Sequence, residues 1–210
     1  MKTATLTTLF SHNLWANLRL LEQCAALTSE QLDATISGAF GSIRDTLRHI
    51  VLAEQGYFSR ISTGQPRHQA KSDASLTITD MLESVRRTGT GLIEWAPRVN
   101  AEETVQVDWE GTPRDVPKTI FLTQVINHAT EHRAHLMANL TQLGIQPPDL
   151  DAWTYFDQLK GSLGRSRERF REEFPISGER GVPRWMKIRG TRRSSRNSGE
   201  LETWNLEPET

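Results

Sequence analysis

Three histidines have the side chains and the positions to hold one divalent metal ion. His128 and His132 are four residues apart in a segment with helical periodicity, so their imidazoles leave one face of a helix about one turn apart. His49 lies in the middle of another amphipathic segment, beside its apolar stripe. Buried imidazoles need partners, either hydrogen bonds or a metal ion. Three neutral imidazoles with an open coordination position are typical of a catalytic metal site, whereas hydrogen-bonded core histidines are the simpler alternative.

The residues around the pair predict that it faces the protein interior. Phe121, Val125 and Leu136 share a helical stripe with His128 and His132. A spacing of four residues does not by itself identify a metal site, because six histidines in 210 residues often leave some pair at that distance. The apolar neighbours therefore favour a ligand pair over two solvent-facing histidines.

Apolar periodicity predicts an all-α fold, a four-helix bundle, to position these residues. The expected helices span approximately residues 3–26, 42–64, 77–95 and 117–143. Ser42 is expected to cap the second helix, Thr77 or Thr79 the third, and Gly144 ends the fourth. Thr28 with a glutamine three residues later resembles a capping box, but the apolar pattern then fades, so a short turn is expected.

A small hairpin is expected before the fourth helix. Residues 104–109 alternate in character and meet a turn at Glu110 and Gly111, and residues 114–116 form the expected return strand. The compact domain is predicted to cover residues 1–160 and to close with a short helix over 149–160.

Residues 161–210 form a polar, Arg- and Ser-rich tail that is predicted to be disordered. The tail has a net charge of +3 and residues 1–160 have −4, so the core lacks the basic excess of a nucleic-acid-binding domain. No nucleic-acid partner is expected for the core, and RNA binding by the tail is a weaker alternative.

The single cysteine, Cys24, excludes an internal disulfide and favours a reducing compartment. Its neighbours Leu20, Leu21 and Leu27 indicate packing rather than catalysis. The first residues lack the apolar core of a signal peptide, and no stretch approaches the ~20 apolar residues of a spanning helix. A cytoplasmic location without membrane contact is therefore expected.

Three motifs in this chain resemble the DinB/YfiT-like superfamily of metalloenzymes. Residues 10–17, Phe-Ser-His-Asn-Leu-Trp-Ala-Asn, are similar to its opening helix, and residues 47–54, Leu-Arg-His-Ile-Val-Leu-Ala-Glu, to its first metal-ligand motif. Residues 127–135, Asn-His-Ala-Thr-Glu-His-Arg-Ala-His, resemble the second, although His135 stands where that family commonly has Gln. The similarity covers residues 5–160.

This resemblance implies an up-down-down-up bundle in which His49, His128 and His132 bind Zn, Ni, Mn or Fe. It also implies a homodimer, to which exposed aromatic residues such as Trp95 and Trp109 could contribute. Known activities of the superfamily use thiols, including mycothiol-dependent maleylpyruvate isomerisation and bacillithiol transfer.

A metal-dependent thiol transferase or isomerase, acting on a small-molecule substrate, is therefore the expected function. The metal's open position would bind a low-molecular-weight thiol as co-substrate, lower its pKa and present the thiolate to an electrophile. Arg133 or Arg48 could hold a substrate carboxylate, or could be solvated.

Two alternatives remain open. Residues 128–132 also fit the His-x-x-Glu-His pattern of inverted zinc peptidases, in which Glu131 would activate a metal-bound water. Glu131 lies about 100° around the helix from His132, and no later helical Glu supplies a further ligand, so hydrolysis is the weaker alternative. A non-catalytic, metal-stabilised stress or binding protein is the other.

The catalytic candidates are Glu131, Arg133 and His135, the last of which could reach the rim of the site or supply an extra ligand. Glu54 is expected to form a salt bridge on a helix surface, with orientation of a ligand as the alternative. His12 is expected to be partly exposed or hydrogen-bonded. His68 is expected to be solvated.

Overall fold

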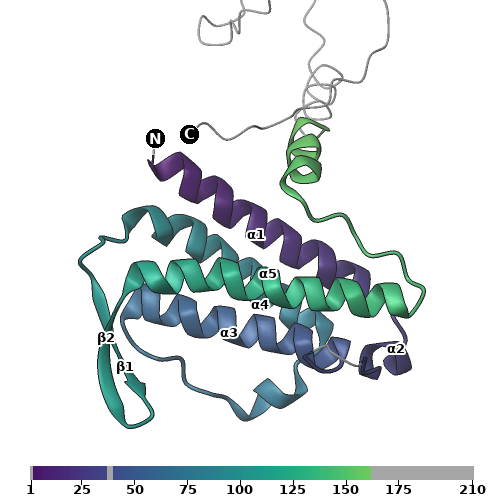
Figure 1. Cartoon of the computed structure of the whole chain (residues 1–210), viewed down its shortest axis with the longest axis horizontal. Helices are drawn as coiled ribbons and strands as arrows, with labels where there is room; N and C mark the ends of the chain where they lie inside the picture. Colours follow the sequence, from purple (N-terminus) through teal and green to yellow (C-terminus); the bar gives the residue numbers. More distant parts are fainter. Residues whose placement is uncertain (1, 37–39, 162–210) are drawn as a thin grey trace, which may run out of the picture. The chain divides into compact units, whose positions relative to one another are not determined.

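The computed structural model describes residues 2–36 and 40–161, which form a helical bundle with a β-hairpin before its last long helix (Figure 1). The long helices are α1 (Lys2–Cys24), α3 (Ile43–Thr63), α4 (Ile78–Trp95) and α5 (Lys118–Gln142). The short elements are α2 (Ser29–Asp33), the 3-10 helices η1 (Lys71–Ser75) and η2 (Ala96–Arg98), and the strands β1 (Thr104–Trp109) and β2 (Thr112–Pro117). Residues 152–161 are also helical.

The chain divides into two units, Met1–Arg165 and Ser166–Thr210, and all described residues belong to the first. Residues 162–210, which make up nearly all of the predicted tail, lie outside the described residues.

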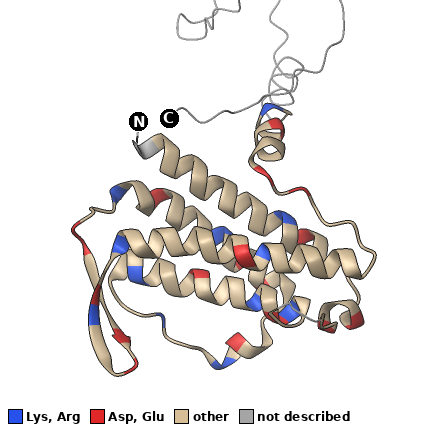
Figure 2. Ribbon diagram, in the orientation of Figure 1, with Lys and Arg blue, Asp and Glu red and all other residues tan. Residues whose placement is uncertain are grey.

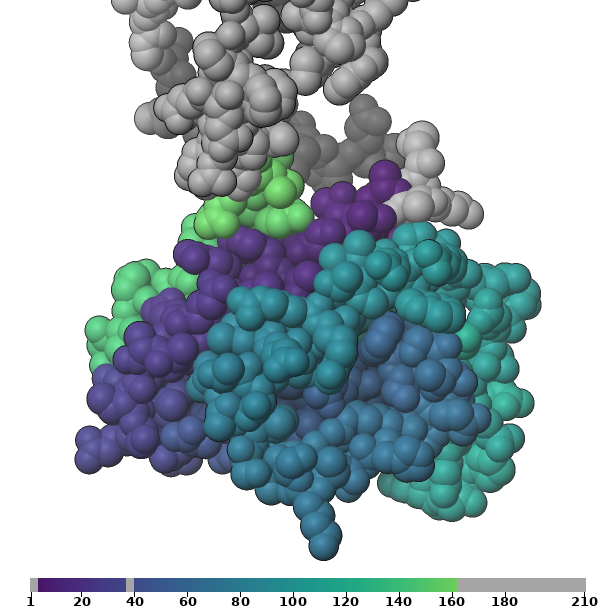
Figure 3. Space-filling view, turned by 180° about the vertical axis from the view of Figure 1, so that it is seen from behind, coloured from purple at the N-terminus to yellow at the C-terminus, as the bar shows by residue number. Residues whose placement is uncertain are grey.

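The helix directions confirm the up-down-down-up connection. α3 and α4 run parallel, since Gln55 and Phe58 of α3 lie against Ser84 and Gly91 of α4 in the same order along both helices. α5 packs on α1 and α3 on the face seen in Figure 1, and Figure 3 shows α4 between α1 and α3 on the opposite face. Each long helix therefore buries two sides.

The predicted caps of α3 and α4 are confirmed. Ser42 Oγ accepts a hydrogen bond from Asp45 N at 3.0 Å, and Thr77 Oγ1 accepts one from Asp80 N at 3.2 Å. Gly64 ends α3 in the left-handed conformation, with φ of 73°. These side chains satisfy amide groups that a helix end leaves without partners.

The prediction of only a short turn after Thr28 was wrong, because a one-turn helix, α2, forms there. Thr28 Oγ1 accepts from Gln31 N at 3.2 Å and Thr28 N donates to Gln31 Oε1 at 3.0 Å, which completes the capping box. Leu32 is buried against the core. Packing of one leucine stabilises this helix, and a periodicity search cannot detect a single apolar residue.

The hairpin has the predicted turn. Trp109 and Thr112 pair across Glu110 and Gly111, whose φ values of 53° and 82° are those of a tight two-residue turn. β2 is longer than predicted and pairs through Pro117, directly before α5. The hairpin therefore fixes where α5 begins.

The apolar core consists of two clusters at opposite ends of the bundle. One includes Leu20, Leu47, Val85 and Leu136, and the other includes Phe10, Ile61, Leu92 and Phe121. Along each of the four long helices, buried polar side chains lie between the residues just named for the two clusters. They are Asn13, Asn17, Glu54, Thr88 and Arg133, here called the polar layer.

Charged residues are distributed over the long helices and the hairpin, although α1 carries few along most of its length (Figure 2). Among the described helices, none has the length and apolar character to span a membrane. Trp109 is exposed on the hairpin, whereas Trp95 packs against the second cluster.

Gly89 marks the closest approach of α4 to α1. A Cβ atom at position 89 would lie 2.6 Å from Leu14 Cδ1 and 3.0 Å from Leu14 Cβ. Replacing a helical glycine by alanine ordinarily stabilises by roughly 0.5–1 kcal/mol, but overpacking a core costs about 1–3 kcal/mol. We expect Gly89→Ala to lower the free energy of unfolding by about 1 kcal/mol, measured by urea denaturation. Gly56→Ala is the matched control, since its Cβ would meet only Arg60 Nη1 at 3.6 Å; equal stabilisation of both variants would contradict the prediction.

Candidate metal centre

The structure brings His49, His128 and His132 together between α3 and α5. Their ring centroids are 4.4–4.8 Å apart, and one potential ligand atom from each lies within 4.8 Å of the others. His128 Nε2 and His49 Nε2 are 2.9 Å apart, and His132 Nδ1 is buried without a hydrogen-bond partner. The triad could therefore hold a metal ion.

Burial keeps these imidazoles in the neutral form that a metal ligand requires. His132 is 6% exposed, and His49 and His128 are partly buried. Desolvation and the neighbouring His132 and His49 lower the pKa of His128 to about 4. Desolvation is also the main cause that lowers the pKa of His49 and of His132. At neutral pH all three rings have a lone pair available.

Aromatic rings border the triad on two sides. The ring of Phe40 lies 4.3 Å from that of His49 and 4.6 Å from that of His132, and half of its surface is exposed. The ring of Tyr57, two turns along α3 from His49, lies edge-on to His128 at 5.8 Å. These rings cover part of the site. Because Phe40 is half exposed and His49 and His128 are only partly buried, the triad lies near the surface.

The polar layer lies next to the triad and joins the helices that carry it. Arg133 Nη1 donates to Asn13 Oδ1 at 2.8 Å and to Asn17 Oδ1 at 2.7 Å. The amide groups of the same asparagines donate to Glu54 Oε2 at 3.3 and 3.0 Å, and Thr88 Oγ1 donates to Glu54 Oε1. The asparagines therefore bridge a buried cation and a buried carboxyl group.

The expectation that Glu54 forms a surface salt bridge was wrong. Glu54 is 3% exposed, and burial raises its pKa to about 7, against the opposing effects of Thr88, Arg133 and the asparagines. Burial also lowers the pKa of Arg133 to about 10. Both groups are thus poorly solvated, and each one stabilises the charged form of the other.

The predicted catalytic candidates lie in different environments. Glu131 is exposed on α5. Arg133 is buried, and its guanidinium donates to Asn13, Asn17 and Thr130, so it is engaged within the bundle rather than open to a substrate carboxylate. His135 is partly buried, its ring lies 5.7 Å from that of His132, and its Nδ1 has no partner.

Other residues singled out from the sequence lie away from the triad or are engaged elsewhere. Arg48 bonds Asp45 and the carbonyl oxygen of Ala74. His12 is hydrogen-bonded to the carbonyl oxygen of Leu150 at 2.9 Å, as expected of a partnered histidine, and His68 is exposed. Cys24 is buried, and desolvation raises the pKa of its thiol to about 12.

Sequence reasoning missed Phe40 as a neighbour of the site and Asn139 as a buried polar residue on the helix that carries His128 and His132. Nothing about an isolated phenylalanine in a glycine-containing connection indicates that its ring covers two histidines. Asn139 is fully buried, with both amide atoms unpartnered, on the stripe of α5 that carries His132 and His135. The signal for Asn139 was available, because it is seven residues after His132 on the same helical face.

The bundle and the histidine cluster define a helical protein with a three-histidine site that could hold a metal ion. The chain belongs to the DinB family, because the family model with that description matches residues 1–162. It is 22% identical over 162 residues to Protein DinB of Bacillus subtilis (strain 168), a comparison that covers 72% of this chain and 94% of that protein. It also resembles the crystal structure of a DinB-like protein from Bacillus cereus ATCC 10987, with a TM-score of 0.48 and 20% identity over 66% of this chain and 91% of that one.

The polar layer predicts strong coupling between Arg133 and Glu54. We expect Arg133→Met to lower the free energy of unfolding by about 3 kcal/mol or more, since it leaves a buried carboxyl group without its cation. The double variant Arg133→Met/Glu54→Leu should lose less than the sum of the two single variants, because no buried charge remains unbalanced. Urea denaturation of the four proteins measures this; losses that simply add would contradict the coupling.

Proposed function

We propose that this protein binds a divalent metal ion through His49, His128 and His132 and acts on a low-molecular-weight thiol as a transferase or isomerase. The observation that carries the proposal is the convergence of three imidazoles from two helices, with their ligand atoms within 4.8 Å of one another. Membership of the DinB family supports it.

The donor set fits such an ion. Imidazole nitrogens bind zinc at ~2.0–2.1 Å, which sets two ligand atoms of a tetrahedral site about 3.3 Å apart. The 2.9 Å between His49 Nε2 and His128 Nε2 is close to that spacing. The orphaned Nδ1 of His132 gives a reason for a further partner, because a buried polar atom without one is costly. Imidazole suits Zn, Ni and Fe, so the donor set leaves the choice of metal open.

The thiol is proposed to come from outside the chain. Cys24 is the only cysteine, and its burial raises the thiol pKa to about 12, so it does not supply a thiolate at neutral pH. A divalent ion at the triad supplies positive charge that favours the thiolate form of a bound thiol. The three histidines are neutral and leave that charge uncompensated, while Phe40 and Tyr57 limit the access of water.

The exposure of Glu131 favours this proposal over hydrolysis. A general base must come within hydrogen-bond reach of the water that it activates. Glu131 lies on the exposed side of α5, and its charge affects His132 without a hydrogen bond between the two. Within the described part of the chain, no carboxylate joins the triad as a possible ligand.

Metal content tests the first part of the proposal. The full chain should retain one divalent ion, measured by plasma mass spectrometry on tag-free protein. His49→Ala, His128→Ala and His132→Ala should each lower the affinity by more than about 100-fold, since groups that merely orient a ligand contribute ~10–100-fold. His68→Ala, which removes an exposed histidine, is the control and should leave the metal content unchanged. Wild-type protein that takes up none of Zn, Ni, Mn or Fe would refute the site.

Thiol binding tests the second part. Glutathione added to the cobalt(II)-substituted protein should change its visible absorption, because a thiol at the open position alters the ligand field. The analogue with a hydroxyl group in place of the thiol is the control and should leave the spectrum unchanged. An unchanged spectrum with every thiol tested, while cobalt stays bound, would remove the thiol proposal and retain the metal site.

A further inference from the structure

The side chain of Phe40 contacts the histidine triad without joining the apolar core. Its ring centroid lies 4.3 Å from that of His49, at an interplanar angle of 33°, and 4.6 Å from that of His132, at 74°. Half of its surface is exposed, and it is not among the described residues of either apolar cluster. Burial in the core therefore does not account for a phenylalanine at this position, whereas contact with the triad does.

The chain directly after Phe40 is anchored at Ser42. Ser42 is 5% exposed and caps α3, because its Oγ accepts from Asp45 N at 3.0 Å and donates to Asp45 Oδ2 at 2.7 Å. It also forms an antiparallel bridge with Thr35. These contacts fix the backbone two residues from Phe40, so the ring is largely preorganised beside the triad before a ligand binds.

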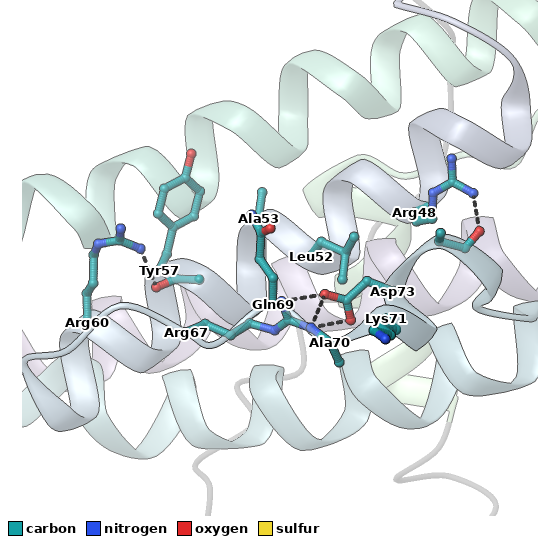
Figure 4. Close-up of a pocket in the computed structure, with 12 residues that line it drawn as sticks. Arg48, Leu52, Ala53, Tyr57, Arg60, Arg67, Gln69, Ala70, Lys71 and Asp73 are labelled. Carbon is teal, nitrogen blue, oxygen red and sulfur yellow. Dashed lines mark hydrogen bonds and ion pairs between the residues drawn. The ribbon is translucent and has the colours of Figure 1, made fainter. Parts of the chain in front are cut away.

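Another side of the triad has a different character. Tyr57 packs edge-on against His128, with ring centroids 5.8 Å apart, and it also lines a hollow of about 640 Å³ between α3 and residues 67–74. Four cationic side chains line this hollow, and one of them, Arg60, follows Tyr57 along α3 (Figure 4). The triad thus has an apolar wall at Phe40, whereas the wall at Tyr57 borders a charged surface.

A molecule held by the triad lies beside Phe40, because Phe40 touches two of the three imidazoles. The exposed half of the phenyl ring is in contact with water, so a ligand that covers it with apolar atoms removes two apolar surfaces from water at once. An aromatic ligand gains a further contribution when its ring packs on that of Phe40. A strongly hydrated group at the same place would lose water and find no polar partner in the phenyl ring.

We propose that Phe40 determines specificity at the triad, and that the thiol accepted there carries an aromatic ring next to its sulfur. The inference rests on the function proposed above and names the substrate class of that site, aryl and arylalkyl thiols. Phe40 acts through direct contact with the aromatic ring of the thiol and binds no metal ion itself.

Two hydroxamates that differ only in their substituent test the apolar wall. Benzohydroxamate carries a phenyl group and acetohydroxamate a methyl group, and both bind metal ions through the same atoms. Titration into the cobalt(II)-substituted full chain, followed by visible absorption, gives the ratio of their dissociation constants. Phe40→Ala should lower the preference for benzohydroxamate about tenfold, the effect of removing roughly 55 Å² of apolar contact. Phe40→Tyr keeps the ring and should retain the preference.

Control variants separate this inference from the metal centre. Trp109→Ala, which removes an exposed aromatic side chain of the hairpin, and Tyr57→Leu, which changes the other wall, should both leave the preference unchanged. Phe40→Ala is expected to fold, because the residue is half exposed. An equal preference in wild type and Phe40→Ala, or a preference lost only in Tyr57→Leu, would overturn the inference and leave the metal centre standing. Wild-type protein that takes up no cobalt would overturn both.

The substrate class has its own measurement. Phenylmethanethiol should alter the cobalt spectrum at about tenfold lower concentration than ethanethiol does, and Phe40→Ala should remove most of that difference. A hydroxamate preference that depends on Phe40 without a matching thiol preference would refute aromatic thiols as the ligand.

The position of the ring can be measured without a metal ion. In the metal-free protein, the ring current of Phe40 should shift the carbon-bound imidazole protons of His49 and His132 in proton NMR spectra. Phe40→Leu should move these resonances and leave those of the exposed His68 in place. Unchanged resonances of both His49 and His132 would overturn the inference, because the ring would then not lie beside the triad.

Discussion

The bundle depends on the buried pair of Glu54 and Arg133, which Asn13 and Asn17 join. Taking either ion out of water costs several kcal/mol, and the protein recovers this only if nearly every donor and acceptor is satisfied. Each asparagine donates its amide group to Glu54 and accepts from Arg133, so one side chain serves both ions. Thr88 of α4 completes the set. Because all four long helices contribute, a bundle with shifted helices would leave a charge buried without partners.

The same interaction determines where the histidines point. Arg133 follows His132 directly, so the two side chains leave α5 about 100° apart. With Arg133 held towards the asparagines of α1, His132 and its neighbour one turn earlier, His128, are turned towards His49 on α3. The hairpin before α5 fixes its start. The geometry of the triad thus follows from the rotation of a single helix.

The two polar regions of the bundle differ in how completely their buried polar atoms are hydrogen-bonded. In the polar layer the ions are matched by partners within the chain, which is what a structural role requires. At the triad, His132 Nδ1 is buried without a partner, and His135 Nδ1 and both amide atoms of Asn139 repeat this along the same stripe of α5. Desolvation there leaves neutral imidazoles, the state in which they bind a cation.

The sequence alone determined the features that depend on neighbours within a few residues. The four long helices, the caps at Ser42 and Thr77 and the tight turn at Gly111 all follow from spacings of two to four positions, and so does the pairing of His128 with His132. Tertiary structure decided the roles of Glu54 and Arg133, whose partners on other helices lie 34 to 120 positions away along the chain. A single glutamate in an amphipathic helix looks like a surface residue until three other helices enclose it. Phe40 belongs to the same group, because its contact with His132 arises only when α5 packs beside the connection that precedes α3.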